Sequence, residues 1–215
     1  MALARPGRNC PRCPRMVALR ELWRAREPGW FNAPVPAFGP REARLAIIGL
    51  APGLRGANRT GRPFTGDFAG GLLYATLTEY GFARGRYDAR PDDGLELIDC
   101  RIVNAVRCAP PQNKPTPAEI AQCRVFLRGA LDSLPQLQTL VALGRIAHDS
   151  VLRALGARLA AHPFAHGARH DLGADAPKLF DSYHCSRYNT NTGVLTAAMF
   201  RDVMRAARDC ALAPV

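Results

Sequence analysis

Four short apolar segments, alternating with segments of helical character, most constrain the fold of this chain. The apolar segments cover residues 44–49, 98–106, 138–143 and 178–183, and helices are expected over residues 16–26, 72–80, 117–133, 144–155 and 193–208. Short apolar runs are typical of strands that are buried on both faces. Strands that alternate with helices form parallel sheets with helices on both faces, so we predict an α/β fold. The length of 215 residues suits a single domain over residues 1–215.

Three polar loops follow predicted strands. They cover residues 49–71, 107–116 and 184–193. In open parallel sheets, ligands bind in a crevice beyond the carboxyl ends of the strands. We therefore expect these loops to converge on one site.

The charge balance predicts a polyanionic partner. The chain has 29 Lys and Arg residues against 18 Asp and Glu residues, which gives a net charge of +11. Neutralising phosphates releases counterions and drives binding to nucleic acid. Lys114 and Lys178 are the only lysines, and an Arg- and Ala-rich chain is typical of a GC-rich genome. That origin explains the choice of Arg over Lys, but it does not explain the excess over acids.

The distribution of apolar residues predicts no membrane partner. No apolar run approaches the ~20 residues that span a bilayer. The first residues lack the apolar segment of a secretory signal. We expect a cytoplasmic protein, and we expect it to be a monomer.

Four cysteines form a candidate metal site. Cys10 and Cys13 have the Cys-x2-Cys spacing, Cys108 follows the second strand, and Cys123 lies within the next helix. Thiolates bind zinc or iron–sulfur clusters, and the spacing does not separate these two possibilities. Alternatively, Cys108 and Cys123 are small buried hydrophobes, as we expect for the three remaining cysteines, Cys100, Cys185 and Cys210.

A glycine-rich loop follows the first strand. It begins with Gly-Leu-Ala-Pro-Gly at residues 49–53 and extends to Asp67. It matches neither a P-loop nor the dinucleotide-binding fingerprint, which argues against a phosphoryl-transfer enzyme. Phe64 is either a stacking platform for a base or a loop anchor packed on the core. Asp67 is either a general base that positions water or the cap of the following helix.

The segment 184–193, His-Cys-Ser-Arg-Tyr-Asn-Thr-Asn-Thr-Gly, also follows a strand. His184 would lie at the carboxyl edge of the sheet, where an imidazole can donate to a developing anion. Ser186 offers a short donor for phosphates, and Arg187 and Tyr188 are long enough to enter a duplex. Alternatively, the segment is a polar cap on the last helix.

These motifs, together with Val-Arg-Cys-Ala-Pro-Pro-Gln-Asn-Lys-Pro at residues 106–115, resemble the type-5 uracil-DNA glycosylases. The resemblance runs from Cys10 to about Gly193. It implies a three-layer αβα sandwich around a four-stranded parallel sheet. It also implies a 4Fe–4S cluster on Cys10, Cys13, Cys108 and Cys123, which would tie down the N-terminal segment. The implied partner is double- or single-stranded DNA that contains deaminated bases.

The same resemblance assigns roles to residues of the loops. Phe64 matches the aromatic residue that stacks on the flipped base, His184 the histidine that contacts its O2 atom, and Asp67 the acid that helps water attack. Asn104 stands where related types use an Asn to read the edge of uracil. Asn113 matches a polar residue of the Asn-Lys-Pro turn in the pocket and is a further catalytic candidate. The backbone amides of Leu50 and Ala51, and the side chains of Ser186 and Arg187, are expected to contact the substrate.

The expected activity is hydrolysis of the N-glycosidic bond of uracil, or of hypoxanthine or xanthine, leaving an abasic site in DNA. Leu50 stands where related types carry an acid or an amide, and its side chain cannot activate water. A non-catalytic nucleic-acid-binding module with zinc or an iron–sulfur cluster is the alternative. It explains the charge and the cysteines, but it does not explain why Phe64, Asp67 and His184 all lie on loops after strands.

Overall fold

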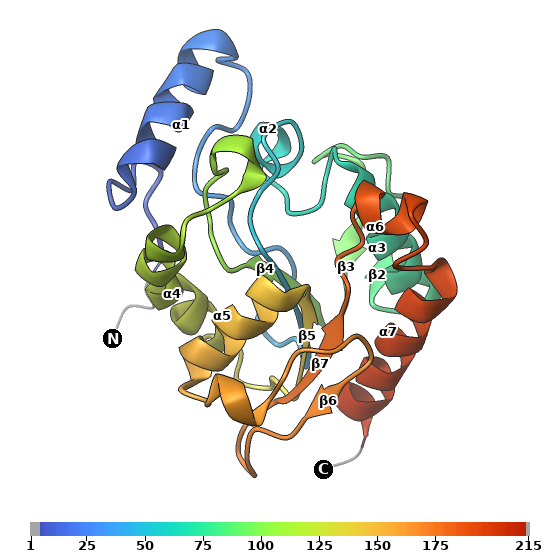
Figure 1. Ribbon diagram of the computed structural model, residues 1–215. Helices are drawn as coiled ribbons and strands as arrows, with labels where there is room; N and C mark the ends of the chain where they lie inside the picture. The colour runs from blue at the N-terminus through green and yellow to red at the C-terminus, as the bar shows by residue number, and fades with distance from the viewer. Residues whose placement is uncertain (1–4, 214–215) are drawn as a thin grey trace.

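The computed structural model describes residues 5–213. Four parallel strands form the centre of the sheet, β1 (Leu45–Gly49), β4 (Cys100–Asn104), β5 (Thr139–Leu143) and β7 (Lys178–Ser182). The strand order is β4-β1-β5-β7-β6. Each predicted apolar segment contains one of these parallel strands, so the predicted parallel sheet is confirmed (Figure 1).

The sheet has a fifth strand that the four-stranded prediction lacks. β6 (Arg169–His170) pairs antiparallel with β7 at the edge of the sheet. It lies between the predicted helix 144–155 and the predicted strand 178–183, where no strand is predicted, because a two-residue strand carries too little periodicity to be recognised.

Two pairs of helices cover the two faces of the sheet. α3 (Phe68–Glu79) and α7 (Ala197–Leu212) pack with Leu45 and Ile47 on one face. α4 (Pro117–Asp132) and α5 (Arg145–Leu155) pack with Ala46 and Ile48 on the other. Because alternate residues of a strand point to opposite faces, β1 is buried on both sides. The predicted three-layer arrangement is confirmed.

Side-chain caps define where several helices begin. Thr116 and Glu119 form a complete capping box at the start of α4. Asp67 caps α3, which begins four residues earlier than predicted, and Thr196 caps α7, which begins four residues later. A capping oxygen fixes the first turn by accepting from a backbone N–H that has no partner within the helix.

Short elements complete the fold and were not predicted. They are α2 (Ala57–Thr60), β2 (Ala83–Arg84), β3 (Glu96–Leu97), α6 (Arg187–Asn191) and the 3₁₀ turns η1 (Pro111–Asn113) and η2 (Leu159–Ala161). β2 and β3 form a separate antiparallel pair.

The first helix, α1 (Pro14–Arg26), is held to α4 by an ion pair. The Arg15 guanidinium donates to both carboxylate oxygens of Glu119, from Nε at 3.0 Å and from Nη2 at 2.9 Å. Glu119 therefore contributes to two features, because its carboxylate pairs with Arg15 of α1 and also accepts from the Thr116 N–H in the capping box of α4. Across residues 5–213, no helix has the length and hydropathy that crossing a membrane requires.

Candidate active site

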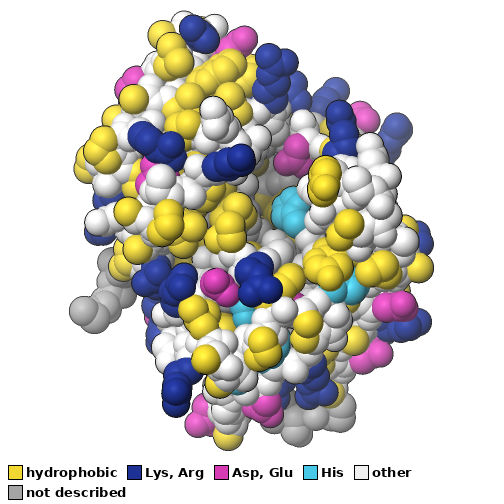
Figure 2. All heavy atoms as spheres, in the orientation of Figure 1, with side chains coloured by type: hydrophobic (Ala, Val, Ile, Leu, Met, Phe, Trp, Pro, Cys, Tyr) yellow, Lys and Arg dark blue, Asp and Glu magenta, His cyan; other side chains and the backbone are white. Residues whose placement is uncertain are grey.

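The three predicted loops converge on one cavity of about 360 Å³ beyond the carboxyl ends of β1, β4 and β7. Figure 2 shows a hollow in this face, with Lys and Arg side chains on the surface around it. All nine residues predicted to contact or process the substrate line this cavity, namely Leu50, Ala51, Phe64, Asp67, Asn104, Asn113, His184, Ser186 and Arg187. Their chemical roles remain predictions.

Phe64 and His184 form one wall of the cavity. Their ring centroids are 6.0 Å apart with 30° between the ring planes. Phe64 is buried, and its backbone has a φ of 52°, which is uncommon for a bulky residue. Tyr87, on the segment between β2 and β3, helps to hold this backbone, since its hydroxyl donates to the Phe64 carbonyl at 3.0 Å. Phe64 is therefore both buried in the core cluster and part of the cavity lining, so the two interpretations of this residue are compatible.

The end of β1 brings Phe64 close to Asn104. Gly49 pairs with Asn104 across β1 and β4. A Cβ atom at Gly49 would contact Asn104 Oδ1 and would lie 2.7 Å from Phe64 Cζ. Only glycine leaves room for both side chains at this position.

Asn104 presents an unpaired acceptor. Its side chain is buried, and its Oδ1 atom has no hydrogen-bond partner among residues 5–213. A buried polar atom without a partner costs about 1–3 kcal/mol. Because Asn104 lines the cavity, a ligand N–H group could satisfy this atom.

Asp67 lines the cavity and also caps α3. One carboxylate oxygen accepts from the backbone N–H of Gly70 at 3.2 Å. Burial raises the pKa of this carboxyl, and the backbone N–H groups of Gly70 and Ala69 offset part of that rise. A raised pKa makes the carboxylate a stronger proton acceptor. The capping role is thus confirmed, and it does not remove Asp67 from the cavity.

The imidazole of His184 is neutral and can donate a hydrogen bond. Burial lowers the pKa of its imidazole, so the ring is neutral near pH 7. The side-chain amide of Asn189 donates to the His184 carbonyl at 2.8 Å, which fixes the backbone beside the ring. A neutral imidazole N–H can stabilise a developing anion without carrying a charge itself.

Asn113, Ser186 and Arg187 lie at the rim. Asn113 is exposed and has a left-handed backbone with φ of 58°. Ser186 caps α6 by accepting from the N–H of Asn189, so part of the segment 184–193 is a helix cap, as in the alternative interpretation. However, this segment caps the short α6 and not the last helix.

The rim includes one aromatic residue that the sequence analysis missed. Phe68 is 45% exposed, and the Arg187 guanidinium lies 5.2 Å from its ring centroid. A large aromatic side chain directly after a helix-capping Asp within a polar loop is a signal that could have identified it.

A second group of residues comes together at the N-terminal side. Cys10, Cys13, Cys108 and Cys123 line one small pocket, and the backbone N–H of Arg107 donates to the Cys123 sulfur at 3.3 Å. Burial, together with the neighbouring thiols, raises the pKa of Cys108 to about 12 and that of Cys123 to about 11. Four thiols that line one pocket are suited to a metal centre, because binding a cation offsets the cost of their ionisation. The remaining cysteines pack in or against the core: Cys100 and Cys185 are fully buried and Cys210 is half-buried.

Comparison with known proteins identifies similar chains. A model of the uracil DNA glycosylase superfamily matches residues 36–208. The type-5 uracil-DNA glycosylase of Thermus thermophilus is 48% identical over 205 residues, which cover 93% of this chain and 92% of the relative. Those of Pyrobaculum aerophilum and Mycobacterium tuberculosis are 40% and 41% identical and cover 93% and 94% of this chain, and 88% and 78% of the relatives.

Proposed function

Because this chain belongs to the uracil DNA glycosylase superfamily, we propose that it hydrolyses the N-glycosidic bond of uracil in DNA and leaves an abasic site. It would act as a monofunctional glycosidase and as a monomer. One observation carries this proposal. Asn104, whose buried Oδ1 atom has no hydrogen-bond partner among residues 5–213, lines the same cavity as Phe64.

The cavity has the groups that a flipped base requires. Enzymes that act on a base extrude it from the stack, bind its edge with hydrogen bonds and stack it on an aromatic side chain. The Asn104 oxygen would accept from the N–H of uracil, and Phe64 would stack on the ring. The backbone amides of Leu50 and Ala51 would contact the opposite edge.

Breaking the glycosidic bond then separates charge. The electron pair of the bond goes to the base, which leaves as an anion, and the sugar acquires oxocarbenium character. The neutral His184 would donate to the O2 atom of that anion. Removing one such donor costs about 2.7–4 kcal/mol, or roughly a hundred- to a thousandfold in rate.

Asp67 would assist the attacking water. Leu50 has no proton-accepting group, and Asp67 is the carboxylate among the residues that line the cavity. Its raised pKa suits a residue that takes a proton from water as the oxygen attacks the sugar.

We further propose that hypoxanthine and xanthine are also accepted. The cavity of about 360 Å³ falls within the range of small-molecule sites, which is about 300–1,000 Å³. The partner would be double- or single-stranded DNA that contains a deaminated base, and the net charge of +11 supports binding to its phosphates.

We also propose that Cys10, Cys13, Cys108 and Cys123 hold a 4Fe–4S cluster. The four residues line one small pocket, and four thiolates are the usual ligand set of such a cluster. When bound, the cluster would link the segment before α1 to β4 and α4 and would take no part in the chemistry at the base.

Product analysis on oligonucleotides tests the activity. Duplexes that contain one uracil, hypoxanthine or xanthine are incubated with the protein, and free base and alkali-labile abasic sites are measured. We expect release of uracil and, more slowly, of the two purines. Tight DNA binding without release of any base would instead favour the non-catalytic nucleic-acid-binding module.

A further inference from the structure

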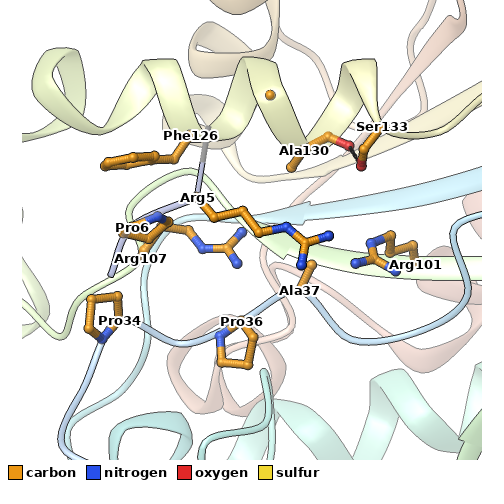
Figure 3. A pocket seen from close by; sticks show the side chains of 11 residues that line it. Arg5, Pro6, Pro34, Pro36, Ala37, Arg101, Arg107, Phe126, Ala130 and Ser133 are labelled. Carbon is orange, nitrogen blue, oxygen red and sulfur yellow. Dashed lines mark hydrogen bonds between the residues drawn. The ribbon is translucent and has the colours of Figure 1, made fainter. Parts of the chain in front are cut away.

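A second cavity, of about 140 Å³, lies between α4 and the segment 34–37, beside the edge strand β4. Its lining includes three arginines, Arg5, Arg101 and Arg107. No Asp or Glu residue lines it within residues 5–213, and it shares no lining residue with the candidate active site. Figure 3 shows the three guanidinium groups in a row between the helix that carries Phe126 and the segment of Pro34 and Pro36.

Arg107 is a built part of this cavity. Its side chain is only 6% exposed, and its Nε atom donates to the Val35 carbonyl at 2.9 Å. That bond orients the guanidinium, and no hydrogen bond of its two Nη groups is seen among residues 5–213. Arg107 also lines the pocket of the four cysteines, so thiolates there would offset part of the cost of burying its charge.

Arg101 supplies a second N–H donor that has no acceptor. Its Nη1 atom donates to the Gly39 carbonyl, whereas its Nε atom is buried and has no hydrogen-bond partner in the described structure. The neighbouring charges of Arg5 and Arg41 are positive, and Glu42 is the acid that acts against them. The positive charges around this cavity therefore exceed the negative ones.

We propose that this cavity binds a phosphate-type oxyanion. A guanidinium presents paired N–H donors that match the oxygens of phosphate, and several of them can surround one tetrahedral anion. The anion would neutralise part of the repulsion among Arg5, Arg101 and Arg107 and would accept from their unpaired donors. The group could belong to free phosphate or to the backbone of DNA, and the experiment below separates these sources. The free-phosphate case does not depend on glycosylase activity.

The first experiment measures thermal unfolding of the full chain in sodium phosphate and in sodium chloride of equal ionic strength. At about ten times the dissociation constant of phosphate, we expect the Tm to rise by about 3–6 °C. The rise should be absent in Arg101→Gln and retained in Arg153→Gln. Arg153 is exposed on α5, so its replacement removes the same charge outside the cavity.

A second variant distinguishes loss of phosphate binding from a general loss of stability. Ala130 lies on α4 at the cavity wall and is half-buried. Ala130→Glu places a carboxylate beside the guanidiniums, where it competes with phosphate. We expect this variant to unfold at or above the wild-type temperature in chloride and to show no further rise in phosphate.

The DNA arm measures affinity for a duplex over a series of salt concentrations. If the bound phosphate belongs to DNA, Arg101→Gln will reduce the slope of log affinity against log salt by about one, and Arg153→Gln will not. A phosphate-specific Tm rise with an unchanged slope identifies free phosphate as the ligand. The proposal is overturned if phosphate and chloride give equal Tm values and the slope of Arg101→Gln equals that of the wild type.

Discussion

Nδ1 of His148 lies 2.7 Å from Oδ1 of Asp181, and both side chains are buried. The other ring nitrogen of His148 lies 2.9 Å from the carbonyl oxygen of His162. A carboxylate and a carbonyl are both acceptors, so the geometry is satisfied when both ring nitrogens carry a proton. His170 contacts the second oxygen of Asp181 at 2.8 Å, so this network joins α5, β6 and β7.

Stability should fall as pH rises because of His148. Burial lowers the pKa of this imidazole, but the hydrogen bond and charge of Asp181, with the His162 carbonyl and Asp149, raise it above 6.5 overall. A raised pKa means that the stabilisation is fully present below about pH 6.5 and is lost as pH rises through the value in the folded protein. We expect the Tm to decrease over this interval.

His148→Gln tests the assignment of that pH dependence. Removing one partner of a buried ion pair costs about 3–5 kcal/mol, so the variant should be destabilised below pH 6.5. Its Tm should also change less with pH than that of the wild type. Equal slopes of Tm against pH for both proteins would show that other groups cause the dependence.

His184→Ala should slow base release under single-turnover conditions by about a hundredfold or more, because it removes the donor to the leaving anion. The loss should be similar for each deaminated base. Since the pKa of His184 is lowered, the wild-type rate should not require a protonated imidazole and should not fall between pH 6.5 and 8 through this group. A rate that drops in that interval and becomes pH-independent in the variant would argue for an imidazolium.

Asp67→Asn should separate water activation from base binding. The amide retains an oxygen that can cap α3, so the Tm should stay close to that of the wild type. Affinity for uracil-containing DNA should also be retained, whereas single-turnover cleavage should fall by about a hundredfold. Cleavage at the wild-type rate would leave Asp67 as a helix cap only.

Cys123→Ser should lose iron and lower the Tm. We expect about four iron atoms per chain in the wild type, with the broad visible absorption of an iron–sulfur protein. Cys100→Ser is a matched control, because Cys100 is fully buried but lies in a different core cluster. Full iron content in Cys123→Ser, or zinc in place of iron in the wild type, would overturn the ligand or the metal assignment.

Arg187→Ala should weaken DNA binding without changing base preference. Its guanidinium lies at the rim over Phe68, where it can reach a phosphate. Loss of one phosphate contact should reduce the salt slope of DNA affinity by about one, equally for uracil-containing and undamaged duplexes. An unchanged affinity and slope would remove this residue from the DNA interface.

All four parallel strands were predicted from the sequence, whereas the two-residue strand β6 was not. β1 and β5 are buried throughout and almost wholly apolar, and β4 and β7 keep a short apolar run beside polar residues such as Arg101 and Asp181. The nine cavity residues were also identified. Eight of them lie in the three loops that follow strands, and Asn104 is the last residue of β4. Patterns of this kind involve residues that are close in the chain, so a single sequence is enough to recognise them.

Contacts between distant residues were not predictable in the same way. The side chains of His148 and Asp181 are separated by 33 positions. Arg5 lies before the first cysteine and Arg107 directly before Cys108, yet both line one cavity. No periodicity relates such residues, and only the folded backbone brings them together. The strand β6 was missed for a related reason, because its partner and not its own two residues defines it.

The close approach of Asn104 and Phe64 to Gly49 affects how much of the binding free energy is used to order the pocket. Gly49 is a residue of β1 paired with Asn104, and the Phe64 ring lies against the space where a side chain would be. The Asn104 amide and the Phe64 ring are therefore held in place by the fold itself, before any DNA binds. Because this part of the pocket is preorganised, binding free energy need not be used to assemble it and is available to extract the nucleotide from the duplex.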